Sequence, residues 1–136
     1  MRYFVAAILI VLGGCAGPGT VSAKRNGDGI LFRFGENGRP GIHLIGIDVF
    51  EVESGRRGRT VCVLQLKKAA QYYGAPLTEW AYGKEPQGGD YEIRDCIGLA
   101  PNVVYGIAGH RYDHRLVWIH FVVHDDGTVH ELRSLE

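Results

Sequence analysis

The sequence predicts an all-β fold, an antiparallel β-sandwich of seven to eight strands. Several short segments place apolar residues at every second position, which is the period of a half-buried strand. Turn signals such as Asn-Gly and Asp-Gly separate these segments, and glycine accounts for 20 of the 136 residues. A chain of this length that is 46% hydrophobic and 22% charged fits one globular domain and excludes a disordered protein.

The predicted strands follow one another at the spacing typical of a sandwich. They are residues 30–34, 42–52, 60–66, 80–82, 90–97, 103–110, 115–124 and 128–132. In the first of them, Ile30, Phe32 and Phe34 share one face. In the fourth, Trp80 and Tyr82 do the same.

The second predicted strand, residues 42–52, is unusually long. Alternation places Ile45, Ile47 and Val49 on one of its sides. Gly46 inside the strand indicates a bulge.

Two further segments lie between predicted strands. Residues 54–59 contain three arginines, which we interpret as a solvated turn, with contact to an acidic partner as the alternative. Residues 67–78 are ambiguous, because one helical turn could form there before Gly74 and Pro76 stop it.

The first residues of the chain predict a signal peptide. Met1 and Arg2 are followed by residues 3–12, ten residues without a charge. Such a run is too short to span a bilayer, which needs about 20 apolar residues. A basic start, a short apolar core and small residues are typical of a secretory signal. The alternative is a buried strand or helix that ends in an incidental cysteine.

The signal ends on Leu12, Gly13, Gly14 and Cys15, which resembles the lipobox of bacterial lipoproteins. The resemblance implies cleavage before Cys15, diacylglycerol on its thiol and acylation of the new amine, so that residues 1–14 are removed. Several acyl chains anchor a protein stably, whereas a single chain binds a membrane only marginally. The first expected partner is therefore the membrane, through the acyl chains on Cys15.

Ala16 follows the cysteine, and in Gram-negative lipoproteins a residue other than Asp there implies export to the outer membrane. The expected location is the periplasmic face of the outer membrane, although a Gram-positive host stays open. Residues 15–28 are rich in Gly, Pro, Ser and charge, which predicts a lipidated cysteine followed by a flexible tether. The tether would reach at most about 45 Å. The sandwich domain is expected over residues 29–136.

Leu99, Pro101 and Tyr105 form an L-x-P-x-x-x-Y pattern. It resembles the tyrosine-corner stretch of fibronectin type III domains. The resemblance implies an immunoglobulin/fibronectin III-like sandwich, in which the proline turns the chain between sheets and the tyrosine hydroxyl bonds back to the backbone. Trp80 and Tyr105 would then be the aromatic anchors of the core. The segment 67–79 departs from the family pattern and leaves the exact topology open.

Besides Cys15, the chain has two cysteines, Cys62 and Cys96, both in predicted strands. The exported side of a membrane is oxidising, so we expect a disulfide between them. It would stabilise the fold by about 4 kcal/mol if it acts by restricting the unfolded chain. One alternative is that both cysteines are buried free thiols. The least favoured alternative is a nucleophilic cysteine paired with a histidine.

Five of the six histidines lie in residues 110–130. Four of them form pairs four residues apart, namely His110 with His114 and His120 with His124. That spacing gathers metal ligands on a helix but separates them by about 13 Å on a strand. A two-residue turn at residues 126–127 would also place His124 and His130 on opposite faces, whereas a three-residue loop would change this register. We therefore expect no metal and no cofactor, with a histidine-dependent metal-binding protein as an alternative.

The sequence does not indicate an enzyme. It has no G-x-S-x-G, no P-loop and no H-E-x-x-H. Asp125 and Asp126 suit a turn, and carboxylates two residues apart elsewhere are typical of a solvated strand face. Fifteen basic residues balance fifteen acidic ones, which excludes the broad basic surface of a nucleic-acid binder.

The expected function is that of a lipid-anchored envelope protein that binds another protein. The order of Cys15, Cys62, Trp80, Cys96 and Tyr105 resembles that of small periplasmic lipoproteins acting as immunity proteins in type VI secretion. That resemblance implies a secreted toxin as the partner. The alternative is a structural outer-membrane lipoprotein that belongs to an envelope assembly.

Overall fold

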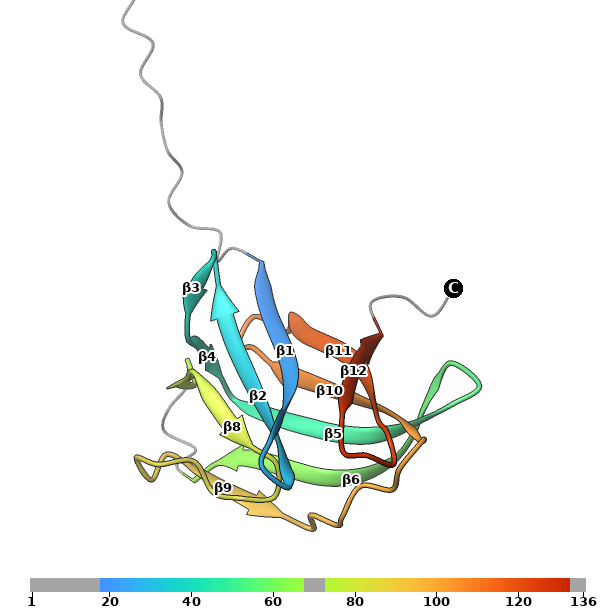
Figure 1. Cartoon of the computed structure of the whole chain (residues 1–136). Coiled ribbons are helices and arrows are strands. Elements are labelled where there is room, and N and C mark those ends of the chain that lie inside the picture. Colours follow the sequence, from blue (N-terminus) through green and yellow to red (C-terminus); the bar gives the residue numbers. More distant parts are fainter. Residues whose placement is uncertain (1–17, 68–72, 133–136) are drawn as a thin grey trace, which may run out of the picture.

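The computed structural model describes residues 18–67 and 73–132, and within these ranges it contains twelve strands and no helix (Figure 1). The strands are β1 (Gly19–Asn26), β2 (Gly29–Glu36), β3 (Arg39–Pro40), β4 (Ile42–Leu44), β5 (Gly46–Glu53), β6 (Arg56–Leu66), β7 (Ala75–Leu77), β8 (Glu79–Ala81), β9 (Tyr91–Arg94), β10 (Val104–His110), β11 (Leu116–Val123) and β12 (Val129–Leu132). A helix that is long and apolar enough to cross a membrane is therefore not found in these ranges.

The strands form two layers. Within each sheet, every pair of hydrogen-bonded strands is antiparallel. One layer has β1 on one edge of β2 and both β3 and β8 on the other. The second layer has six strands in the order β12-β11-β10-β5-β6-β9. In Figure 1 the strands of the two layers cross each other, and β4 pairs with β7 in a small separate ribbon. The prediction of an antiparallel, immunoglobulin/fibronectin III-like sandwich is confirmed.

The core between the layers is built around stacked aromatic rings. Phe32 of β2 lies 5.6 Å from the ring of Trp80 and 5.3 Å from that of Phe121, which in turn lies 5.9 Å from Tyr105. All four side chains are at most 2% exposed. Since these rings come from both layers, they hold the two sheets face to face.

The strand count of seven to eight is too low, and one reason lies in residues 42–52. The chain bends at Ile45, whose N–H donates to the carbonyl of His110 at 2.8 Å, so that this segment forms β4 and β5. Ile45 is 39% exposed whereas Ile47 and Val49 are at most 1% exposed, so the prediction that all three share one side is wrong. The bulge expected at Gly46 falls instead around Phe50, where the β5–β6 register shifts.

The predicted tether is wrong over residues 19–26, and so is the predicted domain start at residue 29. Residues 19–26 form β1, which pairs with β2 along its whole length. Val21 and Ala23 point into the core at 8% and 9% exposure. On the other edge of β1, the carboxylate of Glu131 accepts the N–H of Ala23 at 2.6 Å. The folded domain therefore includes Gly19.

The structure also settles part of the ambiguous segment 67–78. Residues 75–77 form β7, which pairs with β4, rather than the end of a helical turn. Gly74 before it has a φ of 83°, and a side chain there would collide with the backbone of Leu44. The helical turn itself falls mostly on residues 68–72, which lie outside the described residues, as do residues 1–17 with Cys15.

Candidate functional site

The six-stranded sheet has an outer face that turns away from the core. Register places Leu116, Trp118, His120 and Val122 of β11, Gly106, Ala108 and His110 of β10, and Asp48 and Phe50 of β5 on this face. We call these nine residues the outer face. Leu116 and Trp118 are 53% and 54% exposed, which is unusual for large apolar side chains in a strand.

The floor of the outer face is formed by small residues of β10. Ala108 lies opposite Trp118, and Gly106 lies opposite both His120 and Phe50. A side chain on Gly106 would collide with the ring of Phe50. Because Gly106 has no side chain, the Phe50 ring can lie flat on the sheet and is only 9% exposed.

A polar network borders this floor. His110 Nε2 lies 2.7 Å from Asp48 Oδ2, and the guanidinium of Arg57 lies 3.2 Å from the same oxygen. The same guanidinium stacks 4.6 Å from the centre of the Phe50 ring. The hydrogen bond from His110 and, to a smaller extent, that from Arg57 hold the pKa of Asp48 below its usual value, although burial acts in the opposite direction. Asp48 is therefore a carboxylate held ionised at neutral pH.

The basic loop predicted at residues 54–59 is shorter than expected. Only Ser54 and Gly55, both with positive φ, form the turn, and β6 begins at Arg56. Arg57 pairs with Asp48 as described, and Arg59 reaches Glu51 at 2.8 Å. The segment is solvent-exposed as interpreted, but only its first two residues form a turn.

His124, which follows β11, and His130 of β12 share one face, so the chain takes the register of the three-residue loop and not that of the two-residue turn. Val122 lies opposite His130, and the rings of His124 and His130 are 6.1 Å apart. The reason is a three-residue loop over residues 125–127. In it Gly127 adopts a φ of 82°, and the Asp126 carboxylate accepts both the N–H and the hydroxyl of Thr128.

Histidines elsewhere on these strands have other neighbours. The ring of His120 lies 5.1 Å from that of Trp118, and partial burial lowers the pKa of His120. Across the described ranges, no three potential ligands gather closely enough to hold a metal ion. The neighbouring rings of His124 and His130 are thus two potential ligands without a third beside them among the described residues.

Cys62 and Cys96 form the expected disulfide. Cys62 lies in β6 and is fully buried, while Cys96 follows β9, which ends at Arg94 rather than at the predicted residue 97. Beside it the N–H of Ile97 donates to the carbonyl of Val61 at 3.0 Å. The disulfide thus fastens the segment that leaves β9 to the neighbouring strand β6.

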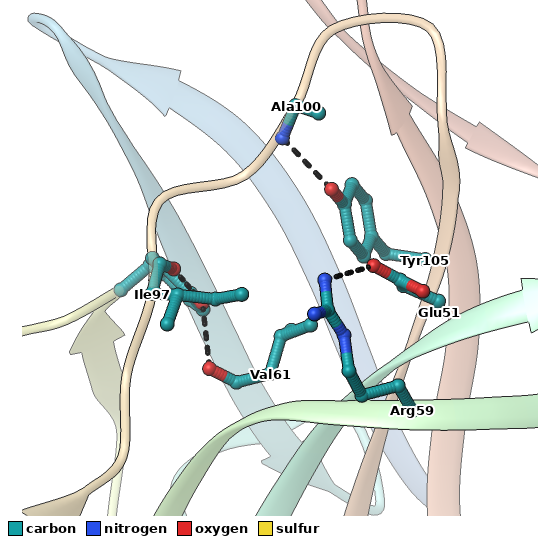
Figure 2. A network of polar contacts seen from close by, with 7 residues as sticks. Glu51, Arg59, Val61, Ile97, Ala100 and Tyr105 are labelled. Carbon is teal, nitrogen blue, oxygen red and sulfur yellow. Dashed lines mark hydrogen bonds and ion pairs between the residues drawn. The ribbon is translucent and has the colours of Figure 1, made fainter.

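The tyrosine corner is present in the predicted place. Figure 2 shows the hydroxyl of Tyr105 pointing at the loop before β10, where it accepts the N–H of Ala100 at 2.8 Å. Tyr105 is 2% exposed, Leu99 packs partly buried against the core, and Pro101 is exposed in the turn. Trp80 is buried, and its indole N–H donates to the carbonyl of Lys84 at 2.8 Å. These residues build the fold and not the outer face.

Tyr82 and Tyr91 are further tyrosines whose hydroxyls bond to the backbone. Tyr82 donates to the carbonyl of Ile97 at 2.6 Å, and Tyr91 donates to the carbonyl of Leu44 at 2.8 Å and also reaches that of Ala75. Burial raises the pKa of both tyrosines to about 12. Their hydroxyls therefore stay protonated and structural.

Sequence reasoning missed Leu116, Trp118, Phe50 and Asp48 as site residues. A signal was available for two of them. Leu116 and Trp118 alternate with Val117, which is 3% exposed, so both faces of β11 carry large apolar side chains. A strand with an apolar outer side needs a partner for that side. By contrast, only the pairing register brings Asp48 beside His110.

Comparison with known proteins identifies no relative of this chain. No family model, no curated protein and no solved structure matches the chain.

Proposed function

We propose that this chain is a lipid-anchored envelope protein that binds another protein through the outer face. The anchor is Cys15 in the lipobox-like Leu12-Gly13-Gly14-Cys15. The observation that carries the binding function is the pair of large side chains Leu116 and Trp118 of β11, which are more than half exposed beside β10. Tryptophan is enriched among the residues that dominate binding energy at protein interfaces.

The outer surface of the other layer is polar, and this difference favours the outer face of the six-stranded sheet as the binding surface. There, outward positions of β1 and β2 carry Thr20, Ser22 and Arg33, all exposed. Arg33 pairs with Glu79 of β8 at 3.1 Å, and both side chains are about half exposed at 53% and 46%. Such a surface is well solvated, so its burial against a partner gains little.

The partner that fits the outer face is a protein with an apolar side chain at the centre of its contact surface. That side chain would pack against the exposed side chains of Leu116 and Trp118. Around it, Arg57 and His110 offer donors to polar groups of the partner's rim. Within this class we propose a secreted toxin, which makes the chain an immunity protein. A component of an envelope assembly is the competing partner.

The anchor is tested by Cys15→Ser. The variant cannot carry the diacylglycerol, so it should leave the membrane fraction for the soluble one, while the unchanged chain should be released only by detergent. A Cys15→Ser protein that still sediments with membranes would refute the anchor.

Binding is tested with a photo-crosslinking amino acid at position 118 in living cells of the host, and at position 33 as the matched control on the other layer. We expect a discrete covalent adduct from position 118 only, with its partner identified by mass spectrometry. The purified partner should then bind the chain directly. If it is a toxin, the chain should abolish its activity, and if it is an envelope component it should copurify without any such activity. Equal adducts from both positions, or none, would contradict the proposal.

A further inference from the structure

The folded domain begins very close to the proposed anchor. The carbonyl of Pro18 accepts the N–H of Asn37 at 3.3 Å, and β1 starts at the next residue. Three residue steps separate Cys15 from Pro18. They span at most about 11 Å. A lipid on Cys15 therefore holds this corner of the sandwich next to the membrane surface.

Two exposed tyrosines lie at the same corner. The Glu36 carboxylate at the end of β2 pairs with Arg111 at 2.8 Å, which ties the corner to the loop between β10 and β11. The next residue of that loop, Tyr112, is 44% exposed, and its ring meets that of Tyr73 at 5.2 Å. Tyr73 is 65% exposed. In Figure 1 the β10–β11 loop and β4 lie toward the end of the sandwich where β1 starts.

Charge differs between the two ends of β1. Around its start, the described residues Arg39, Arg111 and Arg115 face two carboxylates, Glu36 and Asp113. Around its end, the turns carry three aspartates, Asp28, Asp125 and Asp126, against two basic residues of β1, Lys24 and Arg25, of which Arg25 bonds to the carbonyl of Asp126. The two ends of an eight-residue strand lie about 25 Å apart. The more basic end is thus the one beside the anchor.

We propose that the corner around Pro18 rests on the lipid headgroups, with Tyr73 and Tyr112 at headgroup level and the acidic turns pointing away. The inference rests on the proposed lipid anchor at Cys15. Tyrosine suits this position because its ring is apolar and its hydroxyl is polar, and it is enriched where proteins meet membrane interfaces. The exposed Arg39 beside this corner favours an anionic lipid surface.

The orientation is tested with the full lipidated chain in vesicles that contain phosphatidylglycerol and lipids brominated on their acyl chains. Bromine quenches tryptophan only at short range. Two variants are compared, Tyr112→Trp and Asp125→Trp, each combined with Trp118→Phe to remove the exposed tryptophan. The buried Trp80 is common to both and gives the same background.

We expect bromolipid quenching to be several-fold stronger for the tryptophan at position 112 than for that at position 125. Flotation of the vesicles shows separately whether the protein is attached. Attached protein with equal quenching at both positions, or with none, would overturn the orientation but leave the anchor standing. Protein that does not float would refute the anchor, and the orientation with it.

Discussion

The two faces of the six-stranded sheet both carry apolar side chains, but they are used differently. On the inner face Val49, Leu64 and Ile107 are fully buried. On the outer face, Leu116 and Trp118 are more than half exposed in the same sheet. Since apolar area stabilises folding only when it leaves water, the inner face accounts for stability. The outer face keeps exposed apolar area that the described residues do not bury.

The largest effect should come from removing an inner aromatic anchor. Tyr105→Ala deletes a buried ring that packs on Phe121, and by analogy with Phe→Ala it should lower the free energy of unfolding by about 3–5 kcal/mol. Urea denaturation of the non-lipidated Cys15→Ser form measures it. Tyr105→Phe keeps the ring but leaves the N–H of Ala100 without its acceptor, which should cost only about 1 kcal/mol. Two variants as stable as the parent would show that the corner contributes nothing.

Loss of the disulfide should come next. Cys62→Ala together with Cys96→Ala frees the segment after β9, and we expect a loss of about 2–4 kcal/mol. The same urea measurement applies, and the parent protein under reducing conditions is the control, since it should approach the double variant. If reduction and substitution both leave the urea midpoint unchanged, the disulfide does not contribute to stability.

The polar border of the outer face should give a smaller, pH-dependent effect. Asp48 has a depressed pKa in the folded state, so its carboxylate stabilises the fold above its ordinary pKa of about 3.9, and this contribution disappears as the pH falls through the folded value. Asp48→Asn should therefore destabilise the protein at pH 7 and much less at pH 3. Thermal unfolding at both pH values checks it. A difference that is constant with pH would contradict the role given to the His110 and Arg57 contacts.

The sequence predicted the parts of this fold that have strong alternation. Ile30, Phe32 and Phe34 are all buried as expected. Strand β1 was missed because only Val21 and Ala23 are apolar between glycines, a proline and charged residues. Its pairing with β2 is a long-range property that local composition does not reveal.

The register between paired strands could not be predicted from the sequence either. It determines which side chains meet at the candidate site. Asp-Gly is compatible with loops of two or three residues, and bonds from Thr128 to the Asp126 carboxylate select the longer one. The one additional loop residue places His130 on the same face as His124. The contact of Asp48 with His110, 62 residues apart, likewise exists only once β5 and β10 pair.

The smallest stability effect is expected at Trp118, and it gives the most direct test of the outer face. Trp118→Ala should change the free energy of unfolding by no more than about 0.5 kcal/mol, because the side chain is already half in water. Arg33→Ala on the other layer is the matched exposed control. Both variants are titrated calorimetrically with the partner that position 118 crosslinks.

The proposal predicts that Trp118→Ala weakens binding by about tenfold or more while Arg33→Ala binds like the parent. Unchanged affinity of the Trp118→Ala variant, or a loss shared equally by Arg33→Ala, would contradict the assignment of binding to the outer face of the six-stranded sheet.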